Sequence, residues 1–306
     1  SHILQTRMNW FGGTGSSGFT TGTFPTYLLL SPEGNYFSDN FDFLYSTYGL
    51  KFDFGVTDKI GLGVSGYGGV LASDSITNNI SILKGNAYVK LSPIVSVSAG
   101  LGSTFFPENV NRFIAEITLR AEKKKRYSFL INFQAMDAAQ LLYSSFLVDE
   151  RLNANMLLLQ GDYLTRDNWK FSGVYAFTNV SDDNNSNRLQ LRLGRVFRKT
   201  FSIGYEYYYY NFKDSSSLYW SPQNYDSHSL WADWILADDD EAYTVIGGRV
   251  GYIPSEDFIL REFYGLLRYR VTNTFSLQGR LTFSTTIQSE RGYSSTSFGL
   301  AAFWNL

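Results

Sequence analysis

The sequence of 306 residues predicts an all-β fold: a transmembrane antiparallel β-barrel of about 16 strands, with short periplasmic turns and long extracellular loops. The chain divides into short segments in which apolar and polar residues alternate, as in 201–207 and 275–283. A period of two gives each strand one apolar and one polar face. The connections are alternately short and long, and no internal boundary interrupts them. We therefore expect residues 1–306 to form a single barrel domain.

The composition shows many large apolar side chains in a chain that is polar on average. Aromatic residues make up 17% of the sequence, yet the mean hydropathy is −0.17. This combination is expected when every second strand residue faces lipid and its neighbours face water. No run of about 18 apolar residues is present, which excludes a helical span. Cysteine is absent, which excludes disulfides and thiolate metal sites, and a net charge of −2 argues against a nucleic-acid partner.

The alternating segments place the elements in order along the chain. The expected strands are 3–11, 41–55, 60–71, 80–92, 95–105, 111–120, 127–134, 150–163, 169–178, 187–197, 201–212, 225–236, 242–252, 260–271, 275–286 and 295–306. Short polar turns are expected at 56–59, 92–94, 122–125, 165–168, 198–200, 238–240 and 272–274. Longer connections, rich in Gly, Ser, Asn and Asp, are expected at 12–40, 72–79, 135–149, 179–186, 213–224 and 287–294. An even strand number places both termini at the short-turn, periplasmic end. Any secretion signal is expected to have been removed or to lie outside these residues.

Alternation alone does not decide which face is inside, because a soluble barrel or sandwich has its apolar face inward. Three features favour the apolar face outward. Aromatic residues such as Trp169 and Phe275 gather at strand ends beside the short turns, as in an interfacial girdle. Charged residues such as Arg188 and Arg192 alternate with apolar neighbours. The last strand carries an apolar row that resembles the C-terminal insertion signal of outer-membrane proteins, although it ends in Leu: Phe298, Leu300, Ala302, Trp304 and Leu306. We therefore expect the chain to lie in the lipid of a bacterial outer membrane.

The polar rows are expected to line a water-filled lumen. The charged residues assigned to it are Arg112, Glu116, Arg151, Lys170, Arg188, Arg192, Glu206, Asp233, Glu262, Arg268 and Arg280, joined by Lys51, Asp53, Lys84, Lys90, Arg120, Arg249 and Arg270. Basic residues outnumber acidic ones there. Because charged rings set the sign preference of a pore, anion preference is expected. The alternative is that opposed charges pair across strands and only hold the wall together.

Aromatic residues also fall on the inward rows: Tyr67, Tyr88, Tyr208, Tyr210, Trp231 and Tyr264. Flat rings can stack on the apolar faces of sugars, which suits a polymer in transit; the alternative is that they lie near the rims or fill space. The longest connection, 12–40, either folds inward as a constriction or forms a flexible external loop.

One short motif resembles a known family. Its residues are Tyr219, Trp220, Ser221, Pro222, Gln223, Asn224 and Tyr225. The motif resembles the Tyr-aromatic-Ser-Pro-Gln-x-Tyr signature in the C-terminal barrels of exopolysaccharide-export porins, with the cellulose-secretion subunit most alike and the poly-N-acetylglucosamine and Pel exporters related in architecture. The match covers about seven residues, whereas the sixteen-strand layout covers the chain. Pro222 stiffens the return into the next strand, so a loop anchor and a polymer contact are both consistent with the motif.

The resemblance implies a passive conduit for a secreted polysaccharide, with an inner-membrane synthase supplying the chain. Members of that family carry a periplasmic scaffold of tetratricopeptide repeats, and no helical repeat occurs here. The chain is therefore the barrel alone, or it works with a separate scaffold, or it is an unrelated porin. The second functional interpretation is a general or anion-preferring solute porin. Solute porins of this size are often trimers; we expect a monomeric barrel, as in the exporters.

Enzymatic chemistry is not expected. His2 and His228 are the only histidines, and a lipase or protease needs a His beside a nucleophile or an activated water. Within one strand Asp226 and His228 share a face while Ser227 and Ser229 take the other, which separates base from nucleophile. No metal-ligand spacing or phosphate-binding glycine loop is present, so no cofactor is expected.

Overall fold

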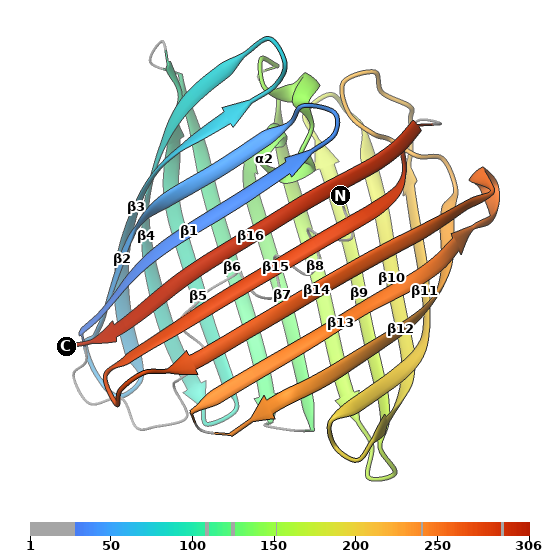
Figure 1. The fold of residues 1–306 in the computed structure, drawn as a ribbon. Helices are drawn as coiled ribbons and strands as arrows, with labels where there is room; N and C mark the ends of the chain where they lie inside the picture. The colour runs from blue at the N-terminus through green and yellow to red at the C-terminus, as the bar shows by residue number, and fades with distance from the viewer. Residues whose placement is uncertain (1–27, 108–109, 124–125, 151, 240, 289–290) are drawn as a thin grey trace.

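The computed structural model describes residues 28–306 except 108–109, 124–125, 151, 240 and 289–290, and it forms a closed antiparallel barrel of sixteen strands (Figure 1). Each strand pairs with its neighbours in the chain, and β16 pairs with β1 to close the cylinder. The predicted all-β barrel is thereby confirmed. None of the helices in the described part of the chain is long and apolar enough to cross a bilayer.

The strands are β1 (Leu28–Asp39), β2 (Leu44–Gly55), β3 (Ile60–Ala72), β4 (Thr77–Ser92), β5 (Val95–Phe105), β6 (Asn111–Lys123), β7 (Tyr127–Asp137), β8 (Asn153–Leu164), β9 (Trp169–Val180), β10 (Asn185–Phe197), β11 (Phe201–Phe212), β12 (Tyr225–Asp238), β13 (Ala242–Ile253), β14 (Phe258–Arg270), β15 (Phe275–Gln288) and β16 (Arg291–Asn305). Short helical segments are α2 (Ala138–Leu142), η2 (Ser145–Leu147) and η3 (Pro254–Glu256).

The apolar row of each strand faces outward. On β8, Leu157 is exposed while its neighbours Met156 and Leu158 are buried inside the barrel. Leu50 on β2 and Phe263 on β14 show the same outward exposure. Such an arrangement suits a lipid environment, because an apolar belt of this kind is the outer surface of membrane barrels. The soluble sandwich considered above is excluded by the closed topology.

The first strand differs from the prediction. Residues 28–39, assigned to the loop 12–40, form β1, whereas the predicted strand 3–11 and residues 12–27 lie outside the described residues. Pro32 lacks a backbone N–H, and the pairing of β1 with β16 skips Ser31 and Pro32. Proline within an alternating segment argues against a central strand, and for this reason the sequence did not predict β1. Leu306, which follows the last residue of β16, donates a backbone hydrogen bond to the carbonyl of Leu28. The start of β1 therefore lies beside Leu306.

The connections at the end opposite the short turns vary in length. Two are long, 138–152 and 213–224. The connections 73–76 and 181–184 are shorter than the predicted 72–79 and 179–186, because β3, β4, β9 and β10 extend further. The Asn, Ser and Thr residues at these strand ends are typical of loops in the sequence, but in the structure they continue the hydrogen-bonded ladders of the strands.

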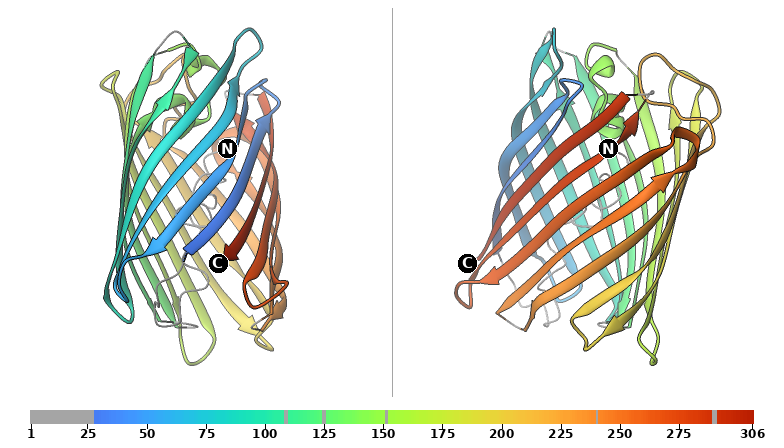
Figure 2. Two further views of the ribbon diagram at one scale, coloured as in Figure 1. Left: turned by 90° about the vertical axis from the view of Figure 1, so that its left-hand side faces the viewer. Right: turned by 45° about the vertical axis from the view of Figure 1, so that its right-hand side comes forward.

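The connection between β7 and β8 folds into the barrel instead of standing above it (Figures 1 and 2). Asp137 begins α2 by accepting a hydrogen bond from the Ala139 N–H at 2.9 Å. Leu141 and Leu147 are 2% and 0% exposed. The Tyr143 ring reaches the opposite wall, where its centroid lies 4.6 Å from that of Phe37 on β1. Residues 138–148, called the plug below, therefore span the lumen from β7–β8 to β1–β2.

Candidate functional site: the lumen

Inward positions carry the polar rows of the strands. They include Arg112, Glu116, Lys170, Arg188, Arg192, Glu206, Asp233, Glu262, Arg268 and Arg280, together with Tyr67, Tyr88, Tyr208, Tyr210, Trp231 and Tyr264. Arg151 lies outside the described residues. The period of two thus assigns the inner face of each strand, but not which side chains meet across it.

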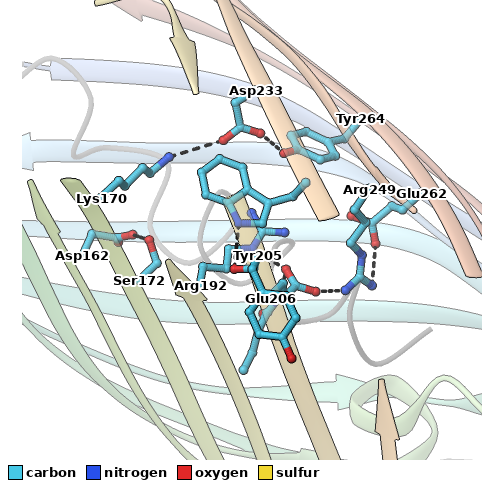
Figure 3. A network of polar contacts seen from close by, with 12 residues as sticks. Asp162, Lys170, Ser172, Arg192, Tyr205, Glu206, Asp233, Arg249, Glu262 and Tyr264 are labelled. Carbon is cyan, nitrogen blue, oxygen red and sulfur yellow. Dashed lines mark hydrogen bonds and ion pairs between the residues drawn. The ribbon is translucent and has the colours of Figure 1, made fainter. Parts of the chain in front are cut away.

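One charge network centres on Glu206, which is 0% exposed (Figure 3). Its carboxylate accepts hydrogen bonds from Arg192, which lies directly opposite on β10, and from Arg249 on β13. Gln190 donates a third at 2.8 Å. Arg249 also donates to Glu262 on β14 at 3.2 Å. A buried carboxylate between two guanidinium groups is stable only because both charges and hydrogen bonds are compensated.

A second network joins β9, β12 and β14. Asp233 accepts a hydrogen bond from Lys170 at 3.3 Å and another from the Tyr264 hydroxyl. The Tyr264 ring lies along the wall because Gly247, opposite it on β13, has no side chain; a Cβ there would overlap the ring. Asp162 on β8 accepts hydrogen bonds from the hydroxyls of neighbouring strands and borders the same space (Figure 3).

Trp231 lies flat on the wall between these two networks. Four inward residues pair directly across neighbouring strands, in the order Lys170, Gly194, Gly204 and Trp231. Because the two glycines have no side chains, the indole can lie against the backbone there. The Lys170 ammonium lies 5.3 Å and the Arg192 guanidinium 5.4 Å from the indole. Each such cation–π contact contributes about 0.5–2 kcal/mol, more when it is desolvated. The indole N–H is satisfied by a backbone carbonyl, that of Tyr205, at 3.1 Å.

Residues of both networks border a cavity of about 170 Å³ in the half of the lumen nearer the short turns, whereas Trp231 is buried and does not line it. Lys170, Arg192 and Arg280 supply its positive charges, and Asp162 and Asp233 its negative charges. Hydroxyl and apolar groups from Ser172, Tyr243, Val245, Tyr264 and Leu266 complete the lining. The cavity is therefore amphiphilic, with charges of both signs beside rings and aliphatic carbons.

Further ion pairs hold other parts of the wall. Lys51 pairs with Asp53 at 3.0 Å, and Lys84 pairs with Glu116 on β6. The sequence assignment missed four inward acids, which are Glu33, Asp39, Asp137 and Asp162. Alternation with apolar neighbours could have identified these acids as inward residues. For Glu33 and Asp39 this signal was obscured, because β1 was assigned to a loop. Pairing across strands, the alternative raised from the sequence, therefore describes much of the inward charge.

The aromatic residues of β11 and β12 form a cluster above these networks, toward the plug end. Tyr208 and Tyr210 are buried, and the Tyr210 ring centroid lies 5.6 Å from that of Trp220. Trp220 also packs edge-on against Tyr225 at 5.1 Å. On the other side of the barrel, Tyr67 donates to Glu33 at 3.0 Å, and the Lys51 ammonium lies 5.2 Å from the Tyr88 ring. Of the predicted lumen aromatics, Tyr208, Tyr210 and Trp231 are at most 2% exposed and fill space in the wall. Tyr67, Tyr88 and Tyr264 are partly exposed on the inner wall.

The motif at 219–225 anchors the loop between β11 and β12. The Tyr219 hydroxyl donates to Asp182 at 2.7 Å and accepts from the Asn184 amide at 2.9 Å. The pKa of Tyr219 is raised above its ordinary value, first by burial and then by the hydrogen bond to Asp182. Ser221 accepts a hydrogen bond from the Ser216 N–H at 2.6 Å. The carbonyl of Pro222 accepts from Phe212 N–H at 2.9 Å, Gln223 donates to the Phe212 carbonyl at 3.1 Å, and Tyr225 contacts Thr286 at 3.1 Å.

The plug is held from several directions. Gln140 contacts Thr104 on β5 at 3.4 Å, and Asn78 on β4 donates to the carbonyl of Val148 at 3.3 Å. Ser144 donates to the carbonyl of Leu218, in the connection after β11, at 2.7 Å. The plug therefore extends into the lumen at the end opposite the short turns. The loop predicted at 12–40 was expected to form either an inward constriction or an external loop, and its residues 12–27 lie outside the described residues.

The residues considered for hydrolysis are split as expected. Asp226 and His228 face outward, while Ser227 and Ser229 are buried on the inward face. His228 contacts Asp226 at 3.1 Å and the Tyr205 hydroxyl, both on the outer surface. Over the described residues, no cluster of three or more His, Cys, Asp or Glu side chains is arranged to hold a metal ion.

Comparisons with solved structures place this fold among bacterial outer-membrane barrels. A bacterial polysaccharide outer membrane secretin superposes with a TM-score of 0.71 at 10% sequence identity, over 91% of this chain and 98% of that one. OpdK of Pseudomonas aeruginosa, solved with vanillate, gives 0.46 at 11% identity, over 92% and 99% of the two chains. A BenF-like porin from Pseudomonas fluorescens gives 0.46 at 9% identity, over 93% and 100%. No family model and no curated protein matches the sequence.

Proposed function

We propose that this protein is a passive channel of the bacterial outer membrane through which a secreted polysaccharide leaves the cell. The single observation that carries the proposal is the lumen cavity of about 170 Å³, in which the rings of Tyr243 and Tyr264 lie beside charged side chains of both signs. A sugar ring has apolar C–H faces and polar hydroxyls at its rim. Aromatic rings beside ionic hydrogen-bonding groups complement both parts of such a ring.

The fold supports the same function. A bacterial polysaccharide outer membrane secretin is a solved structure with which the barrel superposes well, at a TM-score of 0.71. Tyr208, Tyr210 and Tyr225 are buried in an aromatic cluster toward the far end of the lumen, and the ring of Trp220 in that cluster is partly exposed. A partly exposed ring there would give a weak second contact that lets a polymer slide instead of binding it tightly.

The plug sets a requirement on export, because residues 138–148 cross the lumen near the proposed exit and pack against β1 and β5. A polymer leaves only if this segment moves aside. We propose that the growing chain, supplied by an inner-membrane synthase and guided by a periplasmic tetratricopeptide-repeat scaffold, supplies the push. The barrel would act as a monomer, since its lumen and plug are complete within one chain.

The test is single-channel recording with added oligosaccharides. Neutral glucan and anionic uronan oligomers are expected to block the current of the wild-type barrel transiently. Tyr243→Leu is expected to shorten the blockades about threefold or more, since stacking on an aromatic ring contributes about 0.5–1.5 kcal/mol. Tyr163→Leu is the matched control, because Tyr163 is exposed on the outer surface and its loss leaves the lumen unchanged. Blockades of equal length in all three proteins would refute the sugar contact.

A second candidate is an anion-preferring solute porin, favoured by the three positive groups around the 170 Å³ cavity, Lys170, Arg192 and Arg280. Liposome swelling distinguishes the two. A solute porin admits small anions such as benzoate or gluconate at rates that Tyr243→Leu leaves unchanged. The export channel shows little uptake until the plug is removed.

A further inference from the structure

The outer wall of the barrel has a groove across β11–β16 with a volume of about 670 Å³. Its floor is formed by Ala232 and Gly248, which lie directly opposite each other on β12 and β13. Leu230, Val250 and Phe263 form its walls, and all three are half or more exposed. The groove is therefore an apolar depression in the lipid-facing surface.

Gly248 keeps this floor open. A Cβ at this position would lie 2.8 Å from the backbone carbonyl oxygen of Glu262, so a larger residue is excluded without backbone movement. Ala232 adds only a methyl group, while Phe283 stands at the far side of the depression. A linear hydrocarbon chain fits such a channel between larger side chains.

Arg261 lies at the end of the groove nearer the plug end of the barrel. It faces outward on β14, opposite Val250 on one side and Thr285 on the other, and its side chain is exposed. Within the described part of the chain it has no ion pair and no hydrogen-bond partner. An arginine on the lipid face without a protein partner is costly unless a lipid group neutralises it.

The position of Arg261 defines the depth of that lipid group. It is the fourth residue of β14, which begins at Phe258 on the extracellular side, so its guanidinium lies at headgroup level of the outer leaflet. Ser294 on β16 faces outward, pairs directly with Thr285 and adds a second hydroxyl to the same cross-strand row. Among the described residues, Arg195 also faces outward from a strand, but it lies over the rings of Trp169 and Phe197 near the short turns.

We propose that this groove binds a phosphorylated glycolipid of the outer leaflet. Its phosphate engages Arg261, its sugar hydroxyls meet Thr285 and Ser294, and one acyl chain lies over Ala232 and Gly248. The planar guanidinium pairs with phosphate oxygens in a bidentate manner, which an ammonium cannot reproduce. The inference rests on the proposed orientation in the outer membrane and is independent of what passes through the lumen.

The test uses the folded barrel in detergent with purified lipid A as the probe, and native mass spectrometry counts the bound lipid. Wild type is expected to retain one lipid A more tightly than phosphatidylglycerol. Arg261→Gln is expected to weaken lipid A binding about tenfold or more, and Arg261→Lys to restore it only in part. Arg195→Gln, the matched control, is expected to bind as wild type.

A second variant tests the groove itself. Ala232→Phe fills the floor while Arg261 remains, and it is expected to lower lipid A affinity without changing the mobility of the folded barrel on cold gels. Equal lipid A binding by wild type, Arg261→Gln and Ala232→Phe would overturn the proposal. The oligosaccharide blockades described above do not involve this surface, so failure of one experiment leaves the other interpretable.

Discussion

Lys170 on β9 reaches Asp233 on β12 across two intervening strands, with 3.3 Å between the ammonium nitrogen and the carboxylate oxygen. The contact is possible because Gly194 and Gly204, in the row between them, carry no side chains. The Trp231 indole occupies the freed space and lies against the same ammonium. Ionic and aromatic groups of the lumen are thus organised by the glycines of the wall, and this arrangement leads to specific tests.

Substitution of Gly194 tests that dependence. Gly194→Ala is expected to displace the Trp231 ring and to lower the free energy of unfolding by about 1–3 kcal/mol, since its Cβ overlaps the indole. Gly66→Ala is the control, because nothing lies within 4 Å of a Cβ at that position. Guanidinium unfolding of the barrel in lipid vesicles measures both. Equal effects would show that Trp231 does not depend on Gly194.

Glu206 is the charge that two buried arginines share. Glu206→Gln is expected to lower the free energy of unfolding by about 3–5 kcal/mol, because it leaves Arg192 and Arg249 with uncompensated charge. Asp58→Asn, in an exposed turn, is expected to change it by less than about 0.5 kcal/mol. Urea titration followed by gel mobility compares the two. A Glu206→Gln barrel as stable as wild type would contradict the structural role of the network.

The pairing of Lys170 predicts a change in ion selectivity. Asp233→Asn removes the carboxylate partner of Lys170, so its ammonium acts on passing ions and the preference for anions is expected to rise. Asp183→Asn, in the exposed connection after β9, is expected to have little effect. Reversal potentials in a salt gradient give the selectivity. A shift toward cations in Asp233→Asn would reject the basic-lumen interpretation, as would clear cation selectivity of the wild type.

The plug is expected to limit conductance. Replacing residues 138–148 with a short Gly-Ser linker removes the segment that crosses the lumen, so single-channel conductance is expected to rise by roughly twofold or more. Tyr143→Ala is a milder change that removes the ring contacts with Phe37, Phe43 and Tyr45, and it is expected to increase transient openings. Unchanged conductance in both variants would show that ions pass elsewhere.

Tyr219 is expected to stabilise the loop after β11 through its hydroxyl. Tyr219→Phe removes the hydrogen bonds with Asp182 and Asn184 and is expected to lower the free energy of unfolding by about 1–3 kcal/mol, since the buried Asn184 amide loses one of its partners. Tyr209→Phe removes one exposed hydrogen bond, to Asn224 at 3.2 Å, and is the control. Limited proteolysis of the 213–224 connection reports the difference. Cleavage at the wild-type rate in Tyr219→Phe would assign the anchoring to other residues of the motif.

The sequence was sufficient to place individual side chains on faces wherever the alternation was uninterrupted. Lys170 inward with Trp169 outward, and Glu206 inward with Tyr205 outward, both follow from a period of two. It was insufficient at β1, because Pro32 and Gly34 resemble turn signals although the strand tolerates them. It was also insufficient for the plug, because Ala138–Leu142 is too short to show a helical period.

The sequence by itself determined the barrel class, the outward apolar belt and the inward placement of the lumen residues, since strand geometry links side-chain direction to position in the chain. Only the tertiary structure decided which inward residues meet. Register and strand tilt bring Lys170 to Asp233, Arg249 to Glu206 and Tyr143 to Phe37, from strands or loops distant in the chain. Local alternation carries no information about register, so these contacts appear only when sixteen strands close into one cylinder.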